Sequence, residues 1–308
     1  MEEYTPSGDP IGSRPDADIE KAEHWTEIGR YDLAEEAALR ALASDPDNAE
    51  YQVVLGWVYY SSDKHEQAEE CANRAIGVDP ECARALALLG LVHHARGRNQ
   101  LSEECFLAAL RLEPTHSVYL YQYGALLHSV GEHSKAEKLV RACLEQDPDN
   151  SAAHSLLSLV QGERQQSRAA RDSGEVAVGL APDDDFPHYS MGLAYFRSGR
   201  LFKAKRHLRE AARLDPEDEA VVESYELADW YSRWTAILFY YFGVAVGRIP
   251  GAQYTLWGTF VALVFVGPSL GLDPGLVNKI AYFYLAVVIY TWLATPITNL
   301  WVKLRPCP

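Results

Sequence analysis

Small and apolar residues recur with a period of 34 positions over most of the chain. Proline marks the interval and stands at six equally spaced positions: Pro46, Pro80, Pro114, Pro148, Pro182 and Pro216. Small residues lie twelve and five positions before each proline, and a turn residue, most often glycine, lies seventeen before it. Each unit is therefore predicted to hold two short helices joined by a tight turn. The proline cannot continue the second helix but can open the next unit.

Helices this short are not stable alone, so the units are expected to stack and bury a continuous core. The pattern predicts about six units and a closing helix: 15–48, 49–82, 83–116, 117–150, 151–184, 185–218 and 219–230. The first unit is degraded, because Asp18 and Lys21 stand where apolar core residues are expected. The fifth unit has Gly162 and Gly174 inside its helices. Two interpretations of these glycines stay open: a softer joint, or room for a neighbour's side chain.

The period, the phase and the residue classes together resemble the tetratricopeptide repeat (TPR) family, whose unit is a helix–turn–helix of 34 residues. The resemblance covers about Asp18 to Asp218. It implies an all-α fold, a TPR α-solenoid with a concave face, here followed by a C-terminal transmembrane helical hairpin.

The resemblance also implies a partner-binding groove. In this family, positions 2, 5, 9 and 12 of the first helix of each unit face the concave side. Carried onto this chain, they include Trp57, Tyr60, Arg84, Leu91, His94, Tyr121, His128, Phe186, Tyr189 and Phe196. Such a set suits an apolar peptide or helix of a partner protein. Packing against the next repeat, or against residues 1–16, is the equally weighted alternative.

Chaperone-binding members of the family clamp a terminal carboxylate with Lys, Asn and Arg at these positions. Only Arg84 is basic in the present set. The sequence therefore departs from the residue pattern of the family members that bind chaperone tails.

The composition changes after Trp230. No charged residue occurs in 235–247, 249–272 or 280–302. About 20 apolar residues span a bilayer as a helix. We expect an interfacial or re-entrant apolar helix at 231–248, with a third span as the alternative, and a transmembrane hairpin at 249–308 with spans about 254–272 and 280–302. Residues expected at the membrane interface are Trp230, Arg233, Trp234, Arg248, Trp257, Trp301 and Lys303.

Charge is divided unevenly between the two regions. Residues 1–232 hold 23 basic and 42 acidic residues, a net charge of −19, whereas 233–308 carry +4. The acidic region argues against a nucleic-acid surface. Excess positive charge beside the spans predicts that the TPR domain and the C-terminus are cytoplasmic, in an integral protein of a bacterial inner membrane. The bacterial source is suggested by a short resemblance of the C-terminal tail to the membrane tails of some bacterial TPR proteins of unassigned role.

No catalytic motif is visible: there is no phosphate-binding loop, dinucleotide fingerprint, HExxH or GxSxG. We expect no enzyme activity, cofactor or metal. The predicted organisation is a disordered tail at 1–16, a solenoid at 17–230 and the membrane segments above. The function expected is a membrane-anchored TPR adaptor or scaffold that recruits a partner protein. The alternative is an oligomeric membrane assembly in which the hairpins form a pore or channel gated by the TPR domain.

Overall fold

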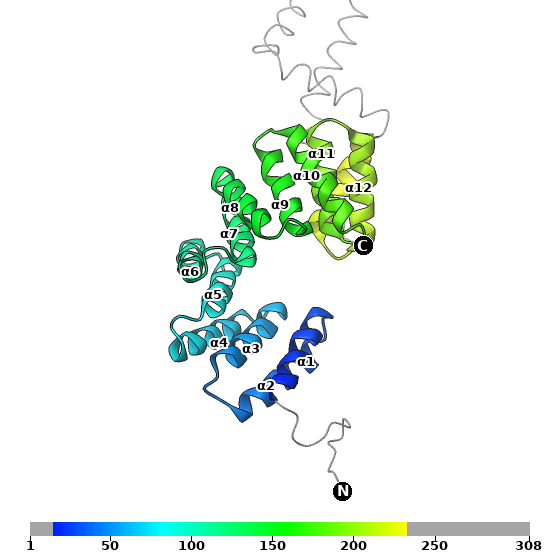
Figure 1. Cartoon of the computed structure of the whole chain (residues 1–308). Coiled ribbons are helices and arrows are strands. Elements are labelled where there is room, and N and C mark those ends of the chain that lie inside the picture. Colours follow the sequence, from blue (N-terminus) through cyan, green and yellow to red (C-terminus); the bar gives the residue numbers. More distant parts are fainter. Residues whose placement is uncertain (1–14, 233–308) are drawn as a thin grey trace, which may run out of the picture. The chain divides into compact units, whose positions relative to one another are not determined.

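The computed structural model describes residues 15–232, and this part of the chain is entirely α-helical (Figure 1). Thirteen helices follow one another: α1 (Pro15–Glu27), α2 (Tyr31–Ser44), α3 (Ala49–Ser61), α4 (His65–Val78), α5 (Ala83–Ala95), α6 (Asn99–Leu112), α7 (Ser117–Ser129), α8 (His133–Gln146), α9 (Ser151–Glu163), α10 (Ser167–Leu180), α11 (Asp185–Arg197), α12 (Leu201–Leu214) and α13 (Glu219–Ser232). The compact unit that holds the repeats ends at Val222, in the first turn of α13.

The helices form six pairs, as the 34-residue period predicts. We call the odd-numbered helices α1 to α11 the A helices and the even-numbered helices α2 to α12 the B helices. From α3 onward, every A helix begins at the first residue of its predicted unit. The prediction of an all-α solenoid of 34-residue helix pairs in this region is confirmed.

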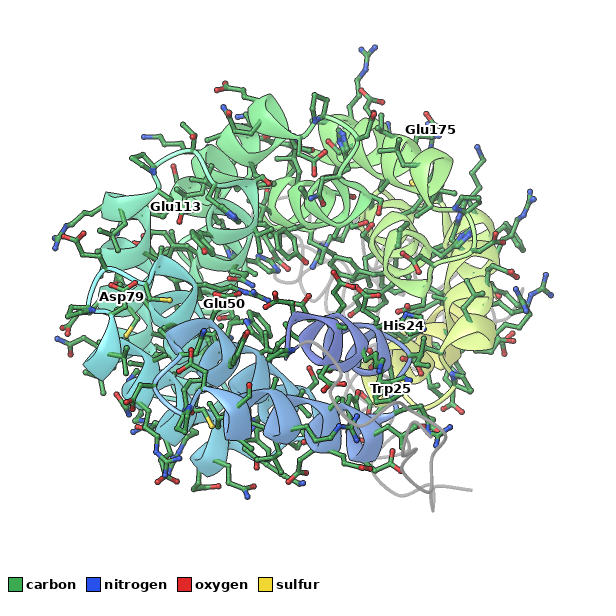
Figure 2. The ribbon with its side chains drawn as sticks, turned by 60° about the horizontal axis from the view of Figure 1, so that its bottom comes forward. His24, Trp25, Glu50, Asp79, Glu113 and Glu175 are labelled. Atoms are coloured by element: carbon green, nitrogen blue, oxygen red, sulfur yellow. The ribbon has the colours of Figure 1, made fainter. Side chains whose placement is uncertain are left out.

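The A helices form the inner row of the stack. Each A helix packs against its own B helix and against the A helix of the next repeat, whereas no two B helices of the described residues make a comparable contact. In a curved stack, helices of successive repeats come closest on the inner side. The A helices are therefore the inner row and the B helices the outer row. Figure 2 shows Glu50 of α3 toward the inner side and Glu175 of α10 toward the outer side.

The turns between A and B helices lie in the left-handed region of backbone space. Four of the six turn residues are glycines with φ of 71–85°. Asp63 and Gln165 fill the same position with φ of 58° and 60°. A residue other than glycine is strained in the left-handed region. We infer that the packing of the flanking helices holds these two turns.

In the A helices, a glycine or serine at one repeated position lets the A and B helices of a pair approach closely. A Cβ atom added to Gly192 of α11 would lie 2.6 Å from Leu208 Cγ of α12. In the fifth repeat this position is Ser158, whose hydroxyl donates a hydrogen bond of 2.7 Å to the Ala170 carbonyl. Both contacts fix the spacing of a helix pair.

The fifth repeat admits side chains from the sixth. A Cβ on Gly162 would lie 2.7 Å from Arg197 Nη1, and one on Gly174 would lie 2.9 Å from Met191 Sδ. Both neighbours belong to α11, and α9 packs against α11 more extensively than any other pair of consecutive A helices. Of the two interpretations of these glycines, room for a neighbour's side chain is the one that the structure supports.

The first repeat keeps a charged residue in its core. Asp18 of α1 is 3% exposed. Its Oδ1 lies 3.5 Å from Lys21 Nζ and 3.6 Å from Arg40 Nη2 of α2. Asp18, one of the residues that degrade the repeat pattern, therefore pairs with Lys21 within α1 and with Arg40 across to α2.

A row of glutamates joins successive repeats. The same B-helix position is occupied by Glu35, Glu69, Glu103 and Glu137. Glu35 binds Lys64 at 2.7 Å, Glu69 binds Arg98 at 2.7 Å, Glu103 accepts from the Tyr123 hydroxyl at 2.8 Å, and Glu137 pairs with Arg164. Each partner belongs to the following repeat, so the row fixes the register of the stack. In the last two repeats the position holds Arg171 and Lys205.

No helix among the thirteen is long and apolar enough to cross a membrane. The predicted spans at 254–272 and 280–302, and nearly all of the predicted segments at 1–16 and 231–248, lie outside the described residues. Six of the predicted interface residues lie there too: Arg233, Trp234, Arg248, Trp257, Trp301 and Lys303. The seventh, Trp230, is on α13, is partly exposed and contacts the Tyr231 ring edge-on at 4.8 Å.

Candidate partner-binding surface

The ten residues predicted to face a partner all lie on A helices. Two are on α3, three on α5, two on α7 and three on α11. All ten are partly exposed, whereas Val58 and Leu88 on the same helices are buried. We call this set the A-helix face: Trp57, Tyr60, Arg84, Leu91, His94, Tyr121, His128, Phe186, Tyr189 and Phe196.

On α3 the face also belongs to the core. The Trp57 and Tyr60 rings meet edge-on with centroids 5.8 Å apart, and both pack against the buried residues of the first repeats. Burial, followed by the nearby Asp63 carboxylate, raises the pKa of Tyr60. These two residues therefore have both a packed side and an exposed side.

Leu91 of α5 and Tyr121 of α7 have a similar double role. Both pack against the central core around Phe106 and Val140. The pKa of Tyr121 is raised by burial first and by Cys143 second. The middle of the face is thus apolar and well supported from beneath.

The two histidines of the face are held by the B helices of their own repeats. His94 Nδ1 lies 3.1 Å from Asn99 Oδ1, and His128 Nδ1 lies 3.3 Å from His133 Nδ1. Burial is the largest cause that lowers the pKa of His128, and the neighbouring His133 adds to it. The lowered pKa favours an uncharged His128 at neutral pH.

Arg84 is paired with two carboxylates from two earlier repeats. Its Nη2 lies 2.6 Å from Glu23 Oε1 of α1, and its Nη1 pairs with Glu50 Oε1 of α3. The basic residue of the predicted set is therefore occupied by the protein's own acids. Glu50 stands at the position equivalent to that of Arg84, one repeat earlier.

A second ion pair lies at the other end of the face. Arg197 of α11 pairs with Glu163 of α9, again 34 residues apart, and crosses over Gly162. Arg84 and Arg197, the two arginines of the described A helices, are thus both paired with carboxylates of other A helices. An apolar ligand meets no unpaired guanidinium at either of these two places.

Phe186, Tyr189 and Phe196 form the C-terminal part of the face. Phe196 packs against the small cluster of Met191, Tyr195 and Ala204. Phe186 and Tyr189 lie in the first half of α11 and are members of none of the core clusters. They are the aromatic residues of the set that the core uses least.

A histidine pair beside this region was not found from the sequence. His188 Nδ1 of α11 and His207 Nδ1 of α12 are 3.2 Å apart, and His188 Nε2 lies 3.0 Å from the Pro182 carbonyl oxygen. A carbonyl only accepts, so His188 Nε2 donates to it, and in a neutral His188 ring the other nitrogen, Nδ1, is the acceptor that faces His207. Burial first, and then His188, Arg206 and Lys203, lower the pKa of His207 to about 4.

Within residues 15–232, no three His, Cys, Asp or Glu side chains gather closely enough to hold a metal ion.

Comparison with known proteins supports the repeat assignment. A tetratricopeptide repeat model matches residues 27–68 and 53–117, and a second tetratricopeptide repeat model matches 186–218. The matched regions of the chain therefore contain tetratricopeptide repeats. Residues 118–185 lie between the two matched regions, yet α7 to α10 repeat the same helix pairs there. No curated protein matches the chain.

Two solved structures share the fold of its helical repeats. One is the crystal structure of the APC/C hetero-tetramer Cut9–Hcn1, with a TM-score of 0.63 and 15% identity over 70% of this chain. The present chain spans 43% of the length of that chain. The other is PilF of Pseudomonas aeruginosa, with a TM-score of 0.57 and 16% identity, covering 71% of this chain and 97% of that one.

Proposed function

We propose that the protein is a membrane-anchored TPR adaptor that binds a partner protein through the A-helix face. The row of partly exposed aromatic residues on α3, α7 and α11 carries this proposal. TPR solenoids use their concave surfaces for binding, and aromatic anchors contribute most of the energy of typical interfaces. These residues stand in the inner row of the stack.

The chemistry of the face favours an apolar helix or extended peptide as the ligand. Arg84 and Arg197 are already paired with carboxylates. A ligand that relied on a terminal carboxylate would have to displace Glu23 or Glu50 from Arg84. An amphipathic helix that lays its apolar side on Trp57, Tyr121 and Tyr189 has no such cost.

The membrane part of the proposal rests on the sequence of residues 233–308. The uncharged stretches 249–272 and 280–302 are long enough to span a bilayer. With two spans, Arg233, Arg248, Lys303 and Arg305 lie on one side, which the positive-inside rule makes cytoplasmic. The repeats would then face the cytoplasm from a bacterial inner membrane.

Anchorage is tested by washing membranes that contain the full chain with high salt and then at alkaline pH. An anchored chain stays with the membranes after both washes. Release at alkaline pH would refute the spanning hairpin and leave the binding role of the A-helix face untouched.

Binding is tested by affinity capture from solubilised membranes with the full chain as bait. The Trp57→Ala/Tyr60→Ala variant should lose the captured partner. A matched control, Leu101→Ala/Leu107→Ala, removes two exposed apolar side chains from the outer helix α6, which are 43% and 39% exposed, and should keep it. Loss in the control alone would place the binding surface on the B helices and refute the proposal.

A further inference from the structure

Helix α12 is basic in an acidic protein. It carries Lys203, Lys205, Arg206, Arg209 and Arg213 against a single acid, Glu210. The chain as a whole has a net charge of −15. The outer helices α2 and α4 show the opposite balance, with three carboxylates and one arginine each. Positive charge is therefore concentrated on the last B helix.

The exposed side of α12 is a stripe of one aromatic ring and several cations. Phe202, Arg206, Arg209 and Arg213 follow one another at intervals of four, three and four residues, which places them on one side of a helix. Lys203 flanks them, and all five are exposed. Leu201, Ala204, Leu208 and Ala211 form the opposite, buried side. We call the five exposed residues the α12 stripe.

Phe202 is 70% exposed, more than any other large apolar side chain of the described residues. A phenylalanine buries a large apolar area when it finds an environment that excludes water. Its position beside arginines on a helix surface is typical of helices that lie on membranes.

Two guanidinium groups of the stripe lack a carboxylate partner within residues 15–232. Arg213 pairs with Glu210 at 2.7 Å, and Lys203 Nζ lies 5.2 Å from the centre of the Tyr195 ring. Arg206 and Arg209 have no such ion pair in this part of the chain. On the other described B helices, Arg40, Arg74 and Arg141 pair with a carboxylate one turn away, whereas Arg111 and Arg171 do not. The α12 stripe therefore presents charge that the repeats themselves do not neutralise.

We propose that the α12 stripe binds the anionic headgroups of a phospholipid membrane, with Phe202 entering the interface. This inference rests on the proposed membrane anchoring. Only 20 residues separate Leu214 from the first uncharged stretch at Thr235. Guanidinium groups bind phosphate oxygens in a bidentate manner, and basic side chains near an anionic surface each strengthen binding about fivefold. An acidic protein surface would satisfy the arginines but offers no apolar layer for Phe202.

The test uses the full chain in two kinds of vesicle, one of phosphatidylcholine alone and one that also contains phosphatidylglycerol. Amide hydrogen exchange is measured on the peptide that covers α12, with the peptide of α10 as an internal reference. We expect α12 to exchange more slowly in the anionic vesicles only. The Arg206→Glu/Arg209→Glu variant should lose this protection. The control Lys135→Glu/Lys138→Glu, which changes the same charge on the outer helix α8, should keep it.

The outcomes separate this inference from the anchoring proposal. Equal exchange of α12 in both vesicles, with the chain firmly bound to both, overturns the lipid contact and leaves anchoring intact. Binding to anionic vesicles alone, weakened roughly 25-fold or more by Arg206→Glu/Arg209→Glu, supports the lipid contact and contradicts anchoring. If both variants lose the protection of α12 equally, the lipid contact is overturned, because the protection would then depend on the overall charge of the protein. A chain that binds neither vesicle overturns both.

Discussion

Glu50 and Arg84 occupy the same position in consecutive repeats, and their side chains form an ion pair. Glu163 and Arg197 are related in the same way at the other end of the stack. Both pairs are 34 residues apart, so each joins equivalent positions of two consecutive repeats. These two interactions between repeats follow the period of the sequence, whereas the contact of Arg84 with Glu23 does not.

The row of glutamates on the B helices yields a first prediction. Glu137 is 2% exposed and pairs with Arg141 and Arg164. Glu137→Ala should destabilise the repeats by about 1.5–3 kcal/mol, because it removes the charge-assisted contacts of a buried carboxylate with Arg141 and Arg164, which are themselves partly exposed. Thermal unfolding followed by circular dichroism measures the loss. Glu145→Ala, at an exposed position of the same helix, should change stability by less than about 0.5 kcal/mol. Equal effects of the two changes would show that the buried pair does not fix the stack.

The close helix contact at Gly192 yields a second prediction. Gly192→Ala places a methyl group 2.6 Å from Leu208 Cγ and should destabilise the protein by about 1–3 kcal/mol. Gly179 lies in α10 with nothing within 4 Å of its added Cβ. Gly179→Ala should therefore stabilise by up to about 1 kcal/mol through helix propensity. If both changes stabilise, the α11–α12 spacing is looser than the structure shows.

The histidine pair between α11 and α12 yields a prediction about pH. The pKa of His207 is about 4, below its ordinary value of 6.5. A lowered pKa means that the folded protein disfavours the charged ring, so stability is present above about pH 6.5 and is lost as pH falls toward 4. We expect a loss on the order of 1–3 kcal/mol from this group. The His207→Gln variant should show a smaller decline in melting temperature over that range. Identical pH profiles of the two proteins would contradict the assignment.

The double role of Trp57 and Tyr60 yields a prediction about stability. Both rings pack against the core with one side. Full burial would make each loss cost about 3–5 kcal/mol. Since both are partly exposed, we expect a smaller cost for Trp57→Ala/Tyr60→Ala than for Phe106→Ala, which removes a ring that is 0% exposed. Melting temperatures of the two variants provide the comparison. A double variant that melts below Phe106→Ala would make the two residues core residues alone.

The helix starts were predictable because one feature, the returning proline, is local and strictly periodic. The breaks in the pattern were harder to interpret. The sequence left two interpretations of Gly162 open, and only the structure showed Arg197 crossing it. Asp18 stands where an apolar residue was expected, and the structure shows it buried with two cations.

Some contacts of the candidate surface could have been found by the same period. Glu50 and Arg84 are separated by one repeat, and the row from Glu35 to Glu137 is visible as a spacing of 34. Glu23 is 61 residues from Arg84 and His188 is 19 from His207, so no repeat spacing relates them. Their contacts depend on side-chain directions at the ends of helices. The membrane segments predicted for residues 233–308 stay predictions.

The central claim, that the A-helix face binds the partner, is tested most directly on α11. Phe186 and Tyr189 are partly exposed and belong to none of the core clusters. The measurement is the affinity of the full chain for its captured partner before and after Phe186→Ala/Tyr189→Ala, with the melting temperature recorded on the same samples. The account predicts an affinity roughly 30-fold weaker or more with little change in melting temperature. Unchanged affinity in a stably folded variant would contradict it.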